Sequence, residues 1–475
     1  MEYISTRGSA PALDFEGATL AGLASDGGLY LPREWPRLSE AEIRAMRGLS
    51  YAALAARIMR PFVAGSLTEA ELEALCKTVY GDFGHAAVTP LVQLNETHWL
   101  LELFHGPTLA FKDVALQLLG HLFETFLERR GKRLTIVGAT SGDTGSAAIN
   151  AVAGRERIEI FMLHPNGRVS EVQRRQMTTV RAPNIHNLAI DGSFDDAQRH
   201  VKRMFSDPEV AHSVGGPLNL GAVNSINWAR LMAQVVYYFY SALQLGAPDR
   251  KIAYSVPTGN FGDVFAGYVA AQMGLPIERL IVATNVNDIL HRALTSGDYS
   301  AGSTTQTITP SMDIQVSSNF ERLLFDCGGR DGAALAAQMQ GFDDSHAMQL
   351  TNAQRQGAAK LFTSARADQK ETARAMQWAW RSAAQVIDPH TGVGLHASLA
   401  APAAGQVEPG TPIVTLATAH PAKFREAVER AVGVRPSLPP RVGDLFGREE
   451  RFTELPGTYD ASRDFVLQHA ADSAS

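Results

Sequence analysis

The chain has 475 residues, of which 45% are hydrophobic and 19% charged, the balance of a folded protein rather than a disordered one. Its formal net charge is −6, and such mild acidity argues against nucleic acid or an anionic membrane as the main partner. The length exceeds what one hydrophobic core usually serves, so we expect more than one domain.

The two cysteines, Cys76 and Cys327, stand far apart, which disfavours a disulfide framework or a cysteine metal site. The histidines have no HExxH or CxxC companions, so we expect no metal. The N-terminus lacks the basic start and apolar core of a secretory signal, and no run is long and apolar enough to span a membrane. We therefore expect a cytoplasmic protein with no membrane partner.

Residues 1–85 predict a separate, mainly helical N-terminal domain. The segment DGGLYLP is typical of a turn followed by a short extended piece. Ser39 with Glu42, and Thr68 with Glu71, have the spacing of capping boxes, in which two side chains three residues apart bind each other's backbone N–H. Small amphipathic helices are therefore expected to dominate this part of the chain.

Beyond residue 90 the sequence predicts strands that alternate with helices. β-branched strands are expected at residues 134–138, 252–256 and 279–285, with another from residue 412. Alternation of this kind indicates parallel sheets, and ligands of such folds bind beyond the carboxyl ends of the strands. The Ala- and Gln-rich segment at residues 330–385 predicts helices.

We expect an α/β fold with two domains that each contain a parallel sheet, in addition to the N-terminal domain. The larger one comprises residues 86–125 and 215–475, and the smaller one residues 126–214.

The segment HGPTLAFKD places Lys112 after a turn at Gly106 and Pro107 and an apolar run. A lysine amine is nucleophilic near neutral pH only when its pKa is lowered, and apolar surroundings lower it by desolvation. The alternative is an ordinary solvated lysine on a helix.

Two loops follow predicted strands and have the composition of anion-binding sites. In PTGNFGD, Gly259 and Gly262 permit a tight turn with free N–H groups at a helix start, which suits one phosphate ester. In GATSGDTGSAA, Ser141, Gly142, Thr144 and Gly145 suit a carboxylate or a phosphate, whereas Asp143 opposes an anion unless its carboxylate points away or meets a cation. A plain strand-to-helix connection is the alternative for the first loop, and the second is a weak signal by itself.

Two further motifs carry polar side chains. In NLGAVNSINWARL, Asn224, Ser225, Asn227 and Arg230 together suit a phosphate dianion. The motif alone favours a helix cap at Asn224 or Ser225 with a solvated Arg230. In LATAHPAKF, Thr418 ends a strand, and the alternative role is an N-cap before Pro421, for which it stands two residues early. DPHTGVG is most simply a turn, with His390 as a catalytic alternative.

A lysine amine, a phosphate-sized glycine loop and a strand-end hydroxyl together match a pyridoxal phosphate site. The amine forms the Schiff base, the loop holds the 5′-phosphate, and the hydroxyl meets the pyridine nitrogen.

The motifs above, with VPTGNFGD, PSMDIQVSSNFERLL and TAHPAKF in this order, resemble the threonine synthase family. YISTRG and ASDGGLYLP resemble the N-terminal segment of its longer, bacterial and fungal form. The resemblance implies the tryptophan-synthase-β-like fold, called fold type II among pyridoxal phosphate enzymes. It also implies a lyase of threonine biosynthesis that converts O-phospho-L-homoserine and water to L-threonine and phosphate.

Residue roles are carried over from the resemblance. Lys112 would bind the cofactor, and Thr418 would contact its ring nitrogen. The remaining cofactor contacts would be Gly259, Asn260, Phe261 and Gly262. The substrate contacts would be Ser141, Gly142, Asp143 and Thr144 for its carboxylate, and Asn224, Ser225 and Arg230 for its phosphate.

Two other functions stay open from the sequence. One is a threonine or serine dehydratase with the same cofactor and fold, and the other is an inactive homologue that senses a phosphorylated metabolite. For the enzyme we expect a small-molecule substrate and a monomer or homodimer.

Overall fold

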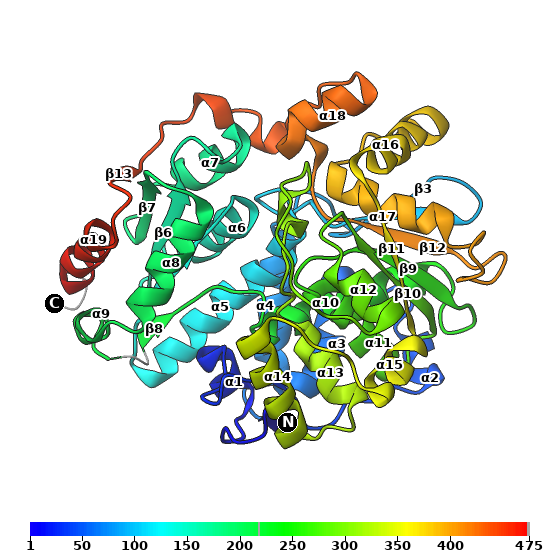
Figure 1. Cartoon of the computed structure of the whole chain (residues 1–475), viewed down its shortest axis with the longest axis horizontal. Coiled ribbons are helices and arrows are strands. Elements are labelled where there is room, and N and C mark those ends of the chain that lie inside the picture. The colour runs from blue at the N-terminus through cyan, green and yellow to red at the C-terminus, as the bar shows by residue number, and fades with distance from the viewer. Residues whose placement is uncertain (217–218, 473–475) are drawn as a thin grey trace. The chain divides into compact units, whose positions relative to one another are not determined.

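The computed structural model describes residues 1–216 and 219–472, and its elements are labelled in Figure 1. The chain divides into two compact units. Unit 1 comprises Met1–Ala18, Leu23–Phe111 and Ser225–Pro436, and unit 2 comprises Thr19–Gly22, Lys112–Asn224 and Ser437–Ser475.

Unit 1 contains a six-stranded sheet in the order β11-β10-β9-β12-β4-β3. Its strands are β3 (Leu91–Gln93), β4 (His98–Glu102), β9 (Ile252–Pro257), β10 (Ile277–Thr284), β11 (Phe362–Arg366) and β12 (Ile413–Ala417). All neighbours are parallel except β3 and β4. Every residue of β9 and β12 is buried, as expected of parallel strands covered on both faces.

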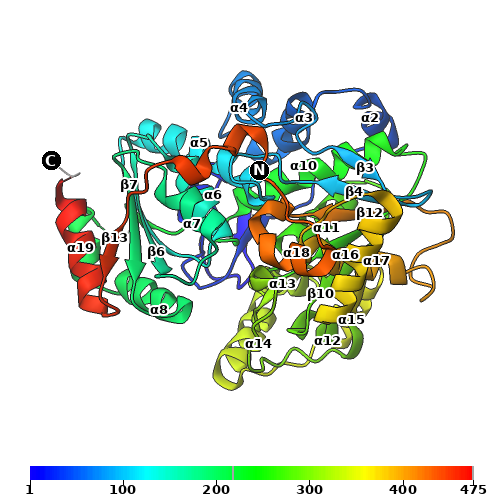
Figure 2. The ribbon, with the colours of Figure 1, turned by 90° about the horizontal axis from the view of Figure 1, so that it is seen from above.

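Helices pack on this sheet, either directly or through other helices. The central ones are α10 (Trp228–Gln244), α11 (Gly262–Gln272), α16 (Gln369–Ala383) and α17 (Pro389–Ala400). Helix α17 packs on β9 and β12, and Figures 1 and 2 both show it beside β12. The others are α12 (Ile289–Ser296), α13 (Phe320–Cys327), α14 (Gly332–Ser345), α15 (Asn352–Ala359) and α18 (Arg425–Val432).

The N-terminal residues form β1 (Tyr3–Ser5), β2 (Tyr30–Pro32) and four helices: α1 (Phe15–Ala21), α2 (Glu40–Ala45), α3 (Tyr51–Val63) and α4 (Glu69–Gly81). Both predicted capping boxes are present, at the starts of α2 and α4. Helix α3 packs on α10, with an apolar face that includes Leu54 and Ile58. The N-terminal segment therefore shares the core of unit 1 and does not form a third compact unit.

Unit 2 contains a parallel sheet in the order β13-β7-β6-β5-β8. Its strands are β5 (Leu134–Ala139), β6 (Ile158–Pro165), β7 (Ile185–Ile190), β8 (Leu220–Gly221) and β13 (Thr453–Leu455). Its helices are α5 (Lys112–Arg130), α6 (Asp143–Val152), α7 (Glu171–Thr178), α8 (Phe194–Phe205), α9 (Pro208–Ser213) and α19 (Tyr459–Asp472). Helices α5 and α6 pack closely, since a Cβ on Gly120 would lie 2.2 Å from the carbonyl oxygen of Ala151.

Apart from Thr19–Gly22, unit 2 extends beyond the predicted smaller domain at three places, one of which is the segment up to Asn224, where β8 pairs with β5. Helix α5 packs on α6, so residues 112–125 belong with the smaller unit. Residues 437–475 also belong to it, because β13 pairs with β7 and Val466 of α19 enters the core formed around Leu188. The sequence pattern of the C-terminal segment does not indicate on which of the two sheets its apolar residues pack.

The predicted strands lie within two residues of the observed bounds. The segment at residues 330–385 differs, because it contains β11 between its helices. Among the described residues, no helix is long and apolar enough to cross a membrane.

Candidate active site

The HGPTLAFKD segment is hydrogen-bonded to the end of strand β12. The amide of Phe111 donates to the carbonyl oxygen of Thr418 at 2.8 Å, and the amide of His420 donates to that of Leu109 at 3.0 Å. Leu109 has a φ of +62°, which forms the bend that the motif makes here. Lys112 is the next residue after Phe111, so these contacts fix the backbone that precedes it.

A side chain strengthens the same junction. Lys423 is 1% exposed, and its Nζ donates to the carbonyl oxygen of Thr108 at 2.7 Å, across 315 residues of sequence. The N-cap of the following short helix, Pro421–Phe424, is His420, whose Nδ1 accepts from the amide of Ala422. Thr418 is therefore not the cap of that helix, and the alternative role for it is wrong.

Lys112 is the first residue of α5 and is only 9% exposed, so the solvated surface lysine is also excluded. Its Nζ lies 3.6 Å from Oδ2 of Asp143. The carboxylate of Asp143 thus meets a cation, which is the condition under which it is compatible with an anion-binding loop.

The loop that carries Asp143 is held from outside by Gln173. Gly142 has a φ of +140°, and a Cβ there would lie 2.6 Å from Cδ of Gln173. Nε2 of Gln173 donates to Oδ1 of Asp143 at 2.8 Å, and its Oε1 accepts from Ser170 Oγ at 2.8 Å. Gln173 was not predicted from the sequence, because only the fold brings α7 beside this loop.

Helix α6 begins at this loop, and its N-cap residue is Gly142, which has no side chain to cap the helix. Its first-turn N–H groups lack intrahelical partners, as at every helix start. Thr140 Oγ1 accepts from the amides of Gly142 and Gly145, which fixes the loop. Ser141 is exposed and Thr144 is half-buried. The loop is therefore a candidate anion site.

The glycine loop follows β9, and α11 begins at Gly262. Its N-cap, Phe261, has a φ of +62° and makes no side-chain cap hydrogen bond. A Cβ on Gly259 would lie 2.7 Å from the carbonyl oxygen of Ser311, so this position admits only bare backbone. An uncapped helix start behind a glycine turn fits a phosphate group.

Residues 310–324, PSMDIQVSSNFERLL, surround the glycine loop. Ser317 Oγ donates to the carbonyl oxygen of Gly259 at 2.6 Å. The amide and the Nδ2 of Asn319 both donate to that of Asn260, at 3.1 and 2.9 Å. The motif therefore holds the loop's carbonyl groups in place.

Strands β9, β10 and β12 run parallel, so the glycine loop after β9 and Thr418 after β12 lie at the same edge of the unit 1 sheet. Phe111 is bonded to Thr418 at that edge. The fold thus brings the lysine segment, the glycine loop and the strand-end hydroxyl to one end of the sheet.

Arg230 is 4% exposed, in the first turn of α10. Burial lowers its pKa to about 10, and within the described part of the chain its Nε and Nη1 have no hydrogen-bond partner. Oδ1 of Asn224 is also buried without one. The cap of α10 is Asn227, so the alternative of a cap at Asn224 or Ser225 with a solvated Arg230 is wrong.

DPHTGVG is the start of α17 rather than a turn, with Asp388 as its N-cap. Nδ1 of His390 lies 2.8 Å from Oδ2 of Asp388, and its Nε2 accepts from the amide of Ser311 at 3.4 Å. His390 therefore links this helix to the segment that surrounds the glycine loop.

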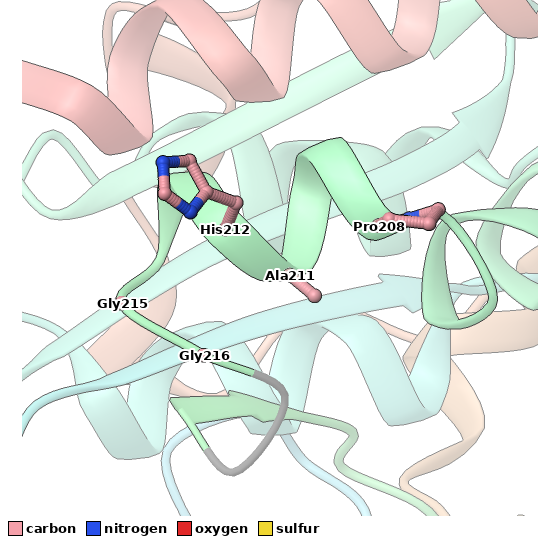
Figure 3. A pocket seen from close by; sticks show the side chains of 5 residues that line it. All are labelled: Pro208, Ala211, His212, Gly215 and Gly216. Carbon is pink, nitrogen blue, oxygen red and sulfur yellow. The ribbon is translucent and has the colours of Figure 1, made fainter.

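An open hollow lies on α9 and the turn after it, lined by Pro208, Ala211, His212, Gly215 and Gly216 (Figure 3). None of these residues belongs to the motifs described above. Nowhere in the described residues do three or more His, Cys, Asp or Glu side chains gather as metal ligands.

Three family models match the chain in succession. They are described as Threonine synthase N terminus, over residues 2–80, Pyridoxal-phosphate dependent enzyme, over residues 83–340, and Threonine synthase, C-terminal, over residues 391–466. The first and last are specific to one enzyme family, whereas the central one identifies the cofactor.

Individual relatives agree. The chain is 54% identical to threonine synthase of Pseudomonas aeruginosa over 470 residues, which cover 99% of this chain and 98% of the relative. The crystal structure of pyridoxal-phosphate-bound threonine synthase from Brucella melitensis matches with a TM-score of 0.95 and 51% identity, over 99% of each chain. The crystal structure of yeast threonine synthase matches with a TM-score of 0.93 and 40% identity, again over 99% of each.

The predicted fold class is confirmed, and so is pyridoxal phosphate as the cofactor. A buried lysine, a phosphate-sized glycine loop and family models over residues 2–80, 83–340 and 391–466 agree with one another. The chain belongs to the threonine synthase family of pyridoxal-phosphate-dependent enzymes.

Proposed function

We propose that this protein converts O-phospho-L-homoserine and water to L-threonine and phosphate. The choice of a phosphorylated substrate rests on the buried Arg230, whose Nε and Nη1 lack a hydrogen-bond partner within the described residues. A guanidinium in this state calls for an anion, and a phosphate dianion satisfies several of its N–H groups at once.

The cofactor is assigned to residues of three segments. Lys112 binds it covalently, the amides of residues 259–262 hold its phosphate, and the hydroxyl of Thr418 contacts the ring nitrogen. Support comes from the burial of Lys112, the uncapped start of α11 and the position of Thr418 at the same sheet edge.

When bound, pyridoxal phosphate accepts electrons from the amino acid and thereby makes its Cα and Cβ protons removable. The amine of Lys112, once released, takes the Cα proton. Loss of a Cβ proton then expels phosphate from Cγ. A proton is added at Cγ, water adds its hydroxyl at Cβ and releases a proton, and the return of a proton from Lys112 to Cα completes threonine. Asp143, 3.6 Å from Nζ, stabilises the lysine whenever it carries the transferred proton.

This contact modifies the predicted substrate site. The carboxylate of Asp143 is occupied by Lys112 and Gln173, and it would repel the carboxylate of a substrate. The amide of Gly142 already donates to Thr140 Oγ1. We therefore assign that carboxylate to the amides and hydroxyls of Ser141 and Thr144, with Gly142 shaping the loop, and we assign Asp143 to the lysine.

The substrate phosphate is assigned to Arg230, with Asn224 and Ser225 beside it in sequence. Desolvation of Arg230 makes its bond to a dianion stronger than the same bond in water. Half-buried Ser225 is anchored through its carbonyl oxygen, which accepts from Asn319 Nδ2 at 3.1 Å.

A dehydratase is the second candidate, because it would use the same lysine and glycine loop. The buried guanidinium favours a phosphorylated substrate over free threonine or serine. An assay with O-phospho-L-homoserine and, separately, with L-threonine separates the two functions by their products.

We further place the enzyme in the cytoplasm, as a monomer or homodimer without nucleic-acid or membrane partners, which accords with its mild net charge.

A further inference from the structure

Arg322 of α13 is a buried cation behind the glycine loop. Its side chain is fully buried, and all its hydrogen bonds in the described structure go to neutral oxygens. Nε and Nη2 donate to the carbonyl oxygen of Tyr30 at 3.1 and 2.8 Å, and Nη2 donates to that of Ile226 at 2.6 Å. Nη1 donates to Oδ1 of Asn319. Burial lowers the pKa of Arg322 to about 9, which leaves it charged at neutral pH.

The bond to Asn319 decides which way that amide group faces. A guanidinium offers only donors, so the atom that meets it is the acceptor Oδ1, and Nδ2 must point the other way. There Nδ2 donates to the carbonyl oxygens of Asn260 and Ser225, at 2.9 and 3.1 Å. Arg322 thus orients the donor that holds the loop.

The direction of the loop's carbonyl groups sets the direction of its amides. In a trans peptide the C=O and the N–H point in opposite directions. The carbonyl of Asn260 is drawn toward Asn319, so the N–H of Phe261 points away from it. The carbonyl of Gly259 is drawn toward Ser317 in the same manner, which turns the N–H of Asn260.

We propose that Arg322 is a positioning residue for the cofactor phosphate. It fixes the loop amides through Asn319, and its buried charge, which makes no direct ion pair in the described structure, attracts the phosphate dianion. The inference rests on the assignment of residues 259–262 to that phosphate. The N-terminal strand β2 contributes to this arrangement, since the carbonyl oxygen of Tyr30 accepts from the guanidinium.

Arg330 provides a matched control. It follows the same helix and donates to the carbonyl oxygen of Pro32 at 3.0 Å, so it also ties α13 to the N-terminal segment. Its charge is neutralised by Asp326, at 2.5 Å, and no contact joins it to Asn319 or the loop in the described structure.

The test compares two probes on the full-length chain freed of cofactor: pyridoxal 5′-phosphate, and pyridoxal, which lacks the phosphate. Arg322→Met is expected to weaken binding of the first roughly tenfold to a hundredfold and that of the second by less than about twofold. Asn319→Ala is expected to act in the same direction. Arg330→Met should lower thermal stability and leave the ratio of the two affinities unchanged.

Gly259→Ala separates the two levels of the argument, because it disturbs the loop itself. If it leaves the affinity ratio unchanged, the assignment of the loop is wrong. The ratio is the affinity for pyridoxal 5′-phosphate divided by that for pyridoxal. If Gly259→Ala lowers this ratio while Arg322→Met and Asn319→Ala leave it unchanged, whether or not they weaken both probes, the inference on Arg322 is overturned and the loop assignment stands. Should Arg322→Met not fold, Asn319→Ala alone decides between these outcomes.

Discussion

The amine of Lys112 lies 3.6 Å from Oδ2 of Asp143, and Gln173 holds the other oxygen of that carboxylate at 2.8 Å. The sequence motif places Asp143 among the ligands of an anion, but its carboxylate is the counter-ion of Lys112. This relationship assigns opposite electrostatic roles to neighbouring residues of one loop.

Asp143→Asn tests this assignment. Asparagine keeps the size of the side chain and its bond to Gln173 but removes the charge next to Lys112. We expect kcat to fall about tenfold, because an ion pair of this burial is worth at least about 1.4 kcal/mol. If Asp143 instead faced the substrate carboxylate, loss of the repulsion would lower KM, and a lower KM with unchanged kcat would contradict our assignment.

Gly142→Ala is expected to disrupt the substrate-carboxylate loop. Its Cβ would lie 2.6 Å from Gln173 Cδ, at a φ that L side chains rarely adopt. Gly154→Ala is the control, since Gly154 also has a positive φ, of +73°, but open space around its Cβ. We expect Gly154→Ala to lose about 1 kcal/mol of stability and Gly142→Ala to lose more because of its contact with Gln173, and we expect only Gly142→Ala to raise KM for the substrate. An equal KM in the two variants would count against this site.

Arg230 is expected to lower the stability of the fold while it strengthens substrate binding. Its folded pKa, about 10, lies below that of the unfolded chain, so its charge destabilises the fold below about pH 10, and this cost declines as the pH rises further. Arg230→Met should therefore raise Tm at pH 7 by an amount equivalent to about 1 to 3 kcal/mol, while KM rises steeply.

Inorganic phosphate gives an independent measure of the same site. In the natural protein it should raise Tm at pH 7, and this effect should fade as the pH passes 10, where Arg230 loses its charge. Arg230→Met should remove the effect at pH 7. A phosphate-induced rise in Tm that persists undiminished in the variant would refute the assignment.

Thr418→Asp changes the group that faces the ring nitrogen. A carboxylate there would keep that nitrogen protonated and make the cofactor a stronger electron acceptor, so side transamination should rise as threonine formation falls. Both product rates can be measured in one reaction by separating amino acids from keto acids. Rates that match those of the natural protein would show that Thr418 does not tune the cofactor.

Much of the scaffold was predictable because its signals are local. The capping boxes at Ser39 and Thr68 depend on residues three positions apart, and β5 and β9 follow from β-branched runs next to glycine-rich loops. Strand β11 was missed because it is a short edge strand with three of its five residues incompletely buried, so it lacks the apolar run that marks a central one.

The site was predictable only in part. Lys112 could be named from its motif, but its burial and its ion pair depend on the packing of α5 against α6. Gln173, Asn319 and Arg322 could not be found, since their partners lie 30, 59 and 292 residues away. A satisfied buried polar network of this kind leaves no periodic pattern in a sequence.

The most direct test is the reaction itself. The purified protein with pyridoxal phosphate is expected to convert O-phospho-L-homoserine to L-threonine with release of one phosphate per threonine, and to form no keto acid from L-threonine. Lys112→Ala should abolish both the cofactor's bound absorption band and turnover, whereas Lys132→Ala, at an exposed lysine, should retain both. Keto acid formation from L-threonine without threonine synthesis, or turnover that survives in Lys112→Ala, would contradict the account.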